Sequence, residues 1–330
     1  MIEFSNDFLY DNFYDSISTS CELFHKIFSF ICCITSTDIP VLIDGETGMW
    51  KPSIAQVIHK SSKRKHEDFL IVDCSNPDEN ALEIELFGHE QEVPYHHTIR
   101  KIGRLEQAHG GSILLDEVGM TPSAIQARLL QVIQNQEIYC VGGTNVVSID
   151  VRIIATTSES LESAVKLGRF REDLFYRIAV FPIHIPPLRT SRRDIKFLAD
   201  YFLKAIAKKT DKPIIGISDD AMKLLMDYDW PGNIKEMKEA IEYAVNVEKY
   251  SKIQSKSLPK EIHPEQKVKP ALQFGNLEDK IIPLEEIEKQ ALIHAMKLTD
   301  NNVQITAKAL GINRATVYRK LDKYNLLIKH

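Results

Sequence analysis

Short apolar runs alternate with helical patterns through the first half of the chain. Five runs of aliphatic and β-branched residues, each bounded by polar or turn residues, predict buried strands at Val41–Asp44, Phe69–Asp73, Ile113–Asp116, Val151–Thr156 and Phe181–Ile185. Helical periodicity between them predicts helices at Ser53–His59, Glu79–Phe87, Pro122–Gln134 and Leu161–Leu167. Strands that alternate with helices indicate a mostly parallel sheet covered on both faces. A hairpin is expected around Gly142–Asn145.

The pattern becomes purely helical from about Arg192 to Lys249. Ser251–Lys280 then combines Lys, Ser, Pro and Glu with few large apolar residues, which is typical of a linker. A last helical unit follows it. These changes predict five parts, namely a tail at 1–14, an α/β part at 15–190, a helical part at 191–250, a linker at 251–280 and a second domain at 281–330.

Composition places the chain among globular proteins, with 330 residues, 44% apolar residues and 26% charged residues. The apolar segment Phe24–Ile34 is too short to cross a membrane, so we expect a core helix, no membrane partner and a cytoplasmic protein. The five cysteines have no paired spacing, which predicts reduced thiols and no structural metal. The net charge of −5 excludes a chain that is basic throughout.

Residues 45–52 read Gly-Glu-Thr-Gly-Met-Trp-Lys-Pro, which is close to a phosphate-binding loop. Gly45 and Lys51 stand at the spacing of such a loop, whose backbone N–H groups surround nucleotide phosphates. The glycine expected before the lysine is Trp50, and the residue after it is Pro52. An acidic pair, Asp116-Glu117, ends an apolar strand, as in proteins that hold Mg²⁺ and polarise water. The sequence therefore predicts a nucleotide-binding scaffold with altered chemistry.

Several longer motifs surround this loop in a fixed order: ELFGHE at 85–90, GRLEQAHGGSILLDEVG at 103–119, GRFREDLFYRI at 168–178, IPPLR at 185–189 and WPGNIKE at 230–236. Over roughly residues 15–250 they resemble the AAA+ domain of bacterial enhancer-binding proteins, the activators of sigma-54 RNA polymerase. The resemblance implies an α/β fold with an AAA+ P-loop parallel sheet and a helical lid. It also implies ATP or ADP with Mg²⁺, and self-association as a dimer or ring.

The resemblance assigns roles to individual positions. It implies nucleotide binding by Gly45, Glu46, Thr47, Gly48, Lys51 and Lys235. It implies catalytic roles for Asp116, Glu117, Arg171 and Arg177, with Asp116 acting through Mg²⁺. Arg171 and Arg177 match two arginine fingers, which act on the nucleotide of a neighbouring subunit.

Five positions depart from the family pattern, and four of them together predict weak or absent ATPase activity, namely Trp50, Pro52, Asp73 and Ser158. Trp50 introduces a side chain where backbone should approach phosphate, and Pro52 removes an N–H. The switch asparagine is Asp73 and the first sensor asparagine is Ser158. The second sensor arginine has become Lys235, which lacks the planar fork of arginine.

A further departure concerns the loop that touches sigma-54 in this family. The six corresponding positions carry no glycine and read Glu92, Val93, Pro94, Tyr95, His96 and His97. A loop that extends and retracts needs the conformational freedom of glycine, which proline restricts. We therefore expect RNA polymerase to be contacted, but not through sigma-54.

The C-terminal residues predict a helix-turn-helix. A helix at Val303–Leu310 is followed by a turn at Gly311-Ile312 and a helix at Arg314–Tyr324. This segment is basic and resembles the Fis-type DNA-binding domain, so the fold class includes an all-α domain after the AAA+ part. Contacts to a specific DNA operator are expected from Asn313, Arg314, Thr316, Arg319 and Lys320. The preceding helix, Leu284–Met296, is a candidate dimer seam.

The chain is thus expected to be a sequence-specific DNA-binding transcription regulator with a degenerate AAA+ domain. Three alternatives remain open from the sequence. One is an ATP-hydrolysing, sigma-54-dependent activator. Another is a regulator that senses a cyclic dinucleotide or other nucleotide at the P-loop face, and the third is a purely structural protein.

Overall fold

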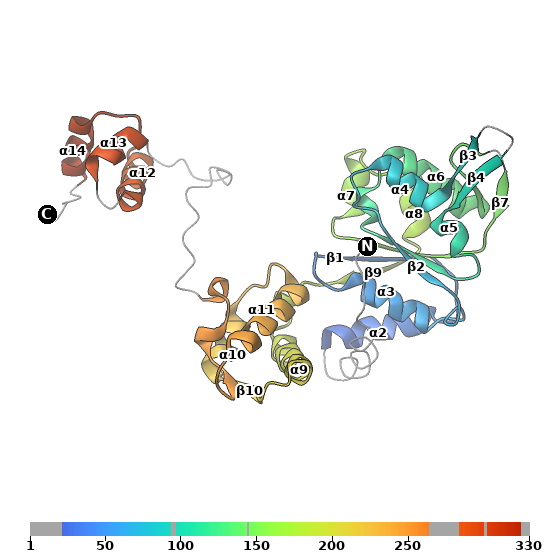
Figure 1. The fold of residues 1–330 in the computed structure, drawn as a ribbon, viewed down its shortest axis with the longest axis horizontal. Helices are drawn as coiled ribbons and strands as arrows, with labels where there is room; N and C mark the ends of the chain where they lie inside the picture. The colour runs from blue at the N-terminus through green and yellow to red at the C-terminus, as the bar shows by residue number, and fades with distance from the viewer. Residues whose placement is uncertain (1–21, 94–96, 144, 264–283, 300–301, 325–330) are drawn as a thin grey trace. The chain divides into compact units, whose positions relative to one another are not determined.

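The computed structural model describes residues 22–93, 97–143, 145–263, 284–299 and 302–324 (Figure 1). The chain divides into two compact units between residues 266 and 267. The expected tail at 1–14 and most of the expected linker lie outside the described residues. Within the described residues, no helix combines the length and the apolar character that crossing a membrane requires.

The first unit contains the predicted parallel sheet. Its strands are β1 (Val41–Gly45), β2 (Phe69–Asp73), β5 (Ser112–Asp116), β8 (Arg152–Thr157) and β9 (Phe181–Ile185). They pair in the order β2-β5-β8-β1-β9, and each neighbouring pair is parallel. Parallel strands end at the same edge of a sheet, so the loops that follow β1, β5 and β8 meet there.

Alternate residues of the strands enter two different cores. Val41 and Ile43 face a cluster shared with α2 (Glu22–Ile34) and α3 (Lys51–Lys60). Leu42 faces the other cluster, with α4 (Glu79–Phe87), α6 (Ser123–Asn135), α7 (Leu161–Lys166) and α8 (Glu172–Ile178). Figure 1 shows these helices on opposite faces of the sheet. The nearly continuous apolar character of the strands follows from burial on both faces.

Two hairpins and a short helix, α5 (Arg104–Gln107), interrupt the alternation. The hairpin expected near residue 142 is present as β6 (Glu137–Tyr139) and β7 (Val146–Ser148). A second hairpin, β3 (Gly88–Val93) and β4 (His97–Ile102), was not predicted from the sequence. Its strands carry mostly polar residues, so they lack the apolar run that identifies a buried strand.

The lid follows a short turn at Leu188–Thr190 and consists of α9 (Arg192–Thr210), α10 (Asp219–Asp227) and α11 (Asn233–Val247). A two-residue parallel pair, β10 (Gly216–Ile217) and β11 (Lys252–Ile253), closes it. Ile253, Leu258 and Ile262 are buried in the lid core. The lid therefore continues to Ile262, past the boundary expected at residue 250, because these isolated apolar residues are anchors rather than linker.

The second unit is a bundle of α12 (Leu284–Leu298), α13 (Val303–Ala309) and α14 (Arg314–Lys323). Its small core contains Leu292, Met296, Ala307, Val317 and Leu321. The turn between α13 and α14 uses Gly311, whose φ of 65° suits glycine. Leu292 and Ala295 of the expected dimer seam are buried within this unit, so their side chains serve its own core.

Candidate functional site

The loop after β1 has a left-handed backbone at Gly48 and at the substituted position Trp50. It runs from Gly45 to Trp50, and α3 begins at Lys51 with Pro52 in its first turn. Trp50 has φ 54° and ψ 36°, a left-handed conformation that glycine normally supplies. Proline is compatible with the first turn of a helix, where N–H groups have no helical partner.

The side chain of Trp50 packs against the lid. Its indole meets the Phe202 ring of α9 edge-on, with centroids 5.4 Å apart and planes at 72°. Trp50 is partly buried against the core that the lid shares with one face of the sheet. The expected steric clash with phosphate is avoided because the indole points to the lid. The left-handed backbone of this non-glycine residue costs about 1–2 kcal/mol.

Lys51 is held by partners within the protein. Its side chain is only 4% exposed. Its Nζ donates to the carbonyl oxygen of Gly45 (2.9 Å) and to Ser158 Oγ (2.6 Å), and lies 3.0 Å from Glu117 Oε1. An ammonium group has three N–H donors, and each has an acceptor here. A phosphate that binds Lys51 must therefore compete with these contacts.

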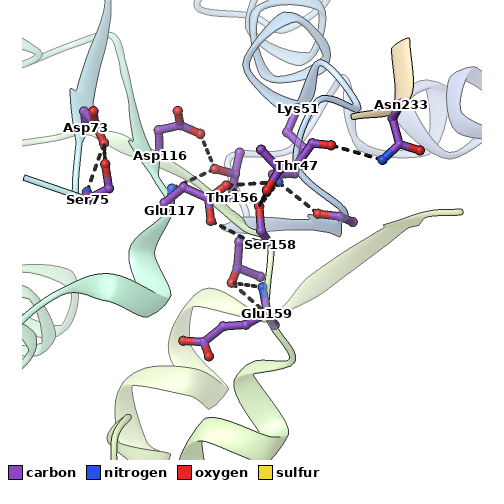
Figure 2. A network of polar contacts seen from close by, with 12 residues as sticks. Thr47, Lys51, Asp73, Ser75, Asp116, Glu117, Thr156, Ser158, Glu159 and Asn233 are labelled. Carbon is purple, nitrogen blue, oxygen red and sulfur yellow. Dashed lines mark hydrogen bonds and ion pairs between the residues drawn. The ribbon is translucent and has the colours of Figure 1, made fainter. Parts of the chain in front are cut away.

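Ser158 connects Lys51 to Glu117 (Figure 2). The Ser158 hydroxyl donates to Glu117 Oε1 (2.5 Å), and its backbone N–H donates to Oε2 (2.8 Å). The hydroxyl oxygen also accepts a hydrogen bond from Thr47 Oγ1 at 3.2 Å. The position that resembles the first sensor thus binds the carboxylate that resembles the catalytic one. Glu117 is kept against Lys51 by this arrangement.

Asp116 and Asp73 lie side by side because β5 and β2 pair in register at these residues. Thr156 Oγ1 donates to Asp116 Oδ1 (2.5 Å), while Asp73 Oδ1 accepts from the backbone N–H (2.9 Å) and hydroxyl (2.6 Å) of Ser75. Burial raises the pKa of the Asp116 carboxyl, and the charges of Glu117 and Asp73 add to this, although the Thr156 hydrogen bond opposes it.

These carboxylates fit a Mg²⁺ ion that arrives with a nucleotide. Mg²⁺ is usually held by one or two carboxylates together with substrate phosphates. No cluster of three or more His, Cys, Asp or Glu residues suited to a metal occurs in the described part of the chain. Asp116 would hold the ion, and the ion would neutralise charge on the phosphates.

Hydrogen bonds also connect the lid and the turn before it to the phosphate loop. Arg189 donates to both carboxylate oxygens of Glu46 (2.8 and 2.5 Å). Asn233 Nδ2 donates to Glu46 Oε2 (3.1 Å) and to the carbonyl oxygen of Thr47 (3.0 Å). The Arg189 hydrogen bonds, followed by that of Asn233, lower the pKa of Glu46 to about 2.

Two backbone contacts bring the lid close to Gly48. The Lys235 N–H donates to the Gly48 carbonyl oxygen (3.1 Å), and a Cβ added at Gly48 would lie 2.1 Å from the Gly232 carbonyl oxygen. The Lys235 side chain itself is exposed. Arg189 and Asn233 were not predicted as site residues, although both belong to motifs that match the family, IPPLR and WPGNIKE.

The structure brings Lys51, Asp116 and Glu117 together but places the two arginines elsewhere. Arg171 precedes α8 and forms a two-pronged pair with Asp173 (3.0 and 2.7 Å). Arg177 is exposed on the same helix. Their expected role on a neighbouring subunit stays a prediction.

In the second unit, several residues expected to contact DNA have partners inside the protein. Asn313 caps the N-terminus of α14. Its Oδ1 accepts hydrogen bonds from the backbone N–H (2.8 Å) and the hydroxyl (2.7 Å) of Thr316. Lys320 pairs with Glu288 of α12. Arg314 and Arg319 are exposed.

Comparison with known proteins identifies three matching families along the chain. The sigma-54 interaction domain matches residues 17–184, the AAA+ ATPase lid domain matches 189–273, and the Fis family of bacterial regulatory proteins matches 283–324. These matches confirm the expected AAA+ sheet with its lid and the Fis-type helix-turn-helix.

Individual relatives are similar over most of the chain. The transcriptional regulatory protein ZraR of Klebsiella oxytoca is 40% identical over 89% of this chain and 65% of its own length. The regulatory protein AtoC of Escherichia coli K12 is 38% identical over 89% of this chain and 64% of its own. The crystal structure of NtrX from Brucella abortus in complex with ADP has a TM-score of 0.69 at 33% identity, over 92% of this chain and 68% of that one. The chain thus spans about two thirds of these relatives.

Proposed function

The chain belongs to the sigma-54 interaction domain family, and from that premise we propose that it is a sequence-specific, DNA-binding bacterial transcription regulator whose AAA+ part binds ATP or ADP but hydrolyses ATP weakly. We propose further that it acts on RNA polymerase without sigma-54, as a cytoplasmic dimer or ring. The contact between Lys51, Ser158 and Glu117 carries the proposal of weak hydrolysis.

Nucleotide binding is supported by the loop and by one relative. Trp50 retains the left-handed backbone of the missing glycine, and its indole lies against Phe202 of the lid. The structure of Brucella abortus NtrX, at 33% identity, was determined with ATP as well as with ADP. Asp116, at the end of β5, would hold the accompanying Mg²⁺.

Weak hydrolysis is supported by the way in which Glu117 is engaged. A general base must be free to orient the attacking water within hydrogen-bond reach. Here both oxygens of Glu117 accept from Ser158, and Oε1 also lies 3.0 Å from Lys51 Nζ. A nucleotide that recruits Lys51 must break part of this network, and Ser158 still retains the carboxylate.

Independence from sigma-54 is supported by the β3–β4 hairpin. Glu92 pairs with Thr98 and Val93 pairs with His97 in an antiparallel ladder. The positions of the expected polymerase-contacting loop that lie within the described residues are therefore strand residues. Pro94, Tyr95 and His96 lie outside the described residues. A paired, glycine-free segment is a poor substitute for a loop that extends during a nucleotide cycle.

Binding and turnover of nucleotide should be measured on the same preparation. Calorimetric titration with ATP, ADP and a cyclic dinucleotide tests binding, and phosphate release tests turnover. We expect ATP and ADP to bind and turnover to be slow. Lys51→Ala should weaken binding about tenfold or more, because a charge-assisted hydrogen bond is lost. Lys60→Ala, at the other end of α3, is the matched control.

Three outcomes would redirect this proposal. Rapid phosphate release that disappears in Lys51→Ala would make the chain a working ATPase. Heat with the cyclic dinucleotide alone would favour the sensor alternative. Transcription by purified polymerase containing sigma-54, but not by polymerase with the main sigma factor, would contradict sigma-54 independence.

A further inference from the structure

The exposed face of α14 contains residues without an assigned role. Val317 and Leu321 point into the core of the second unit. Ala315, Tyr318, Arg319 and Asp322 are exposed, at positions i, i+3, i+4 and i+7, so they share one side of the helix. Arg314 is also exposed and precedes Tyr318 by one turn. Tyr318, whose side chain is 53% exposed, is the one large apolar surface on this face.

Three of the five residues expected to contact DNA have partners within the protein, namely Asn313, Thr316 and Lys320. Asn313 Oδ1 receives both donors of Thr316. The Lys320 ammonium is bound by Glu288, and Lys323 Nζ lies 2.5 Å from Glu285 Oε1. Arg314 and Arg319 are exposed cations at the start and in the middle of α14, and they flank the apolar pair Ala315 and Tyr318.

We propose that Tyr318, together with Ala315, determines operator specificity by packing against thymine methyl groups in the major groove. This inference rests on DNA binding by α14, which is part of the proposed function. In the major groove a thymine differs from a cytosine by its 5-methyl group and O4 acceptor, and apolar side chains contact the methyl group. Guanine contacts by Arg314 or Arg319 would place such thymines next to guanines in each half-site.

Uracil provides a chemical test, because replacing thymine by uracil removes only the methyl group. Duplexes that the full chain binds are first enriched from a random library, and each thymine is then replaced by uracil in turn. We expect one position per half-site at which uracil weakens wild-type binding about fourfold, the effect of one buried methyl group. Tyr318→Ala should bind the thymine duplex about fourfold more weakly than the wild type does. Its affinity should not change when that thymine is replaced by uracil. Tyr318→Phe should retain the wild-type response, because the ring makes the contact.

A matched control is Tyr243→Ala, since Tyr243 on α11 is 52% exposed and belongs to the other unit. It should change neither affinity nor uracil response. Circular dichroism should show the same helix content for each variant, because Tyr318 is outside the core of its unit.

Each other result overturns the inference in a distinguishable way. Absence of any enriched duplex would remove DNA binding itself, and with it this inference. Enrichment without a uracil effect, a uracil effect that persists in Tyr318→Ala, or its loss in Tyr318→Phe would remove only the role of the Tyr318 ring.

Discussion

The Trp50 indole and the Phe202 ring meet edge-on with centroids 5.4 Å apart, and this contact joins the phosphate loop to the lid. The contact requires Trp50 to adopt a left-handed backbone conformation, which costs about 1–2 kcal/mol. An edge-to-face aromatic pair contributes about 0.5–1.5 kcal/mol beyond the area that it buries. The substitution therefore exchanges backbone strain for contact with the lid.

Replacing Trp50 by glycine removes the contact with Phe202 and the backbone strain together. We expect Trp50→Gly to lower the free energy of unfolding by about 1 kcal/mol, because the lost side-chain burial exceeds the relief of backbone strain. Hydrogen exchange should also increase in α9 around Phe202. ATP affinity should change by less than about threefold, since the loop backbone already has the glycine conformation. Calorimetry and urea unfolding measure both quantities.

Trp50→Phe is the control for this prediction. It should retain most of the contact with Phe202 and leave Trp230 as the fluorescent reporter of unfolding. A Trp50→Gly variant that binds ATP far more tightly than the wild type would show that the indole blocks the phosphate site after all.

The Ser158 hydroxyl should compete with phosphate for Lys51. In Ser158→Ala the hydrogen bonds from Lys51 and to Glu117 are both lost, while the backbone N–H at this position remains. One net hydrogen bond is worth about 0.5–1.5 kcal/mol, so ATP affinity should rise by up to about tenfold. Calorimetric titration of Ser158→Ala beside Ser148→Ala, an exposed serine on β7, measures the difference. Unchanged affinity in Ser158→Ala would mean that these contacts do not oppose binding.

The sequence was sufficient for the sheet because buried strands are marked by short apolar runs. The ends of β2 and β9 are predicted to the residue, and those of β1, β5 and β8 to within one. The β3–β4 hairpin was missed because its residues, such as His89 and Glu92, lack apolar alternation. The extent of the lid was underestimated because Ile253 and Leu258 are isolated apolar residues whose burial depends on tertiary packing.

The candidate site likewise has features that the sequence predicts and features that depend on tertiary packing. Lys51 and Glu117, which the loop spacing and the strand-end acids single out in the sequence, lie close together because parallel strands share one edge. The direction of the Trp50 side chain was not predictable, because it depends on α9, which is about 150 residues away in the sequence. The role of Asn233 also depends on a turn that brings the lid to Glu46 and Thr47.

The pair of Glu46 with Arg189 should make lid stability depend on pH. The pKa of Glu46 is lowered from 4.5 to about 2, so the carboxylate contributes fully above pH 4.5 and loses its contribution as the pH falls toward 2. The Glu46 side chain is 39% exposed, which limits the contribution to about 1 kcal/mol.

Glu46→Gln tests this linkage. At pH 7 it should lower the free energy of unfolding by about 1 kcal/mol relative to the wild type, and the difference should fade between pH 4.5 and pH 2. Glu162→Gln, an exposed site on α7, should show no such trend. A deficit that persists at pH 2 would point to disturbed packing instead of a lost ion pair.

Glu288 should compete with DNA phosphate for the Lys320 ammonium, because the two side chains form an ion pair. Glu288 accepts from Lys320 and from the hydroxyl of Tyr324 (2.7 Å), which ties α14 to α12. Glu288→Gln removes a negative charge. That charge attracts Lys320, and it lies close to the DNA-binding helix α14. The Lys320 ammonium then becomes available to a backbone phosphate, so affinity for DNA should rise. The slope of log affinity against log salt should steepen by about one, since one more phosphate is neutralised.

Fluorescence anisotropy between about 50 and 200 mM salt measures this slope, because phosphate contacts show their effect over that range. Glu239→Gln on α11 makes the same chemical change in the other unit and should leave the slope as in the wild type. The double variant Glu288→Gln, Lys320→Ala should return the slope to the wild-type value, because the released cation is gone. A slope that stays steep in the double variant would assign the gain to the general loss of negative charge and not to Lys320.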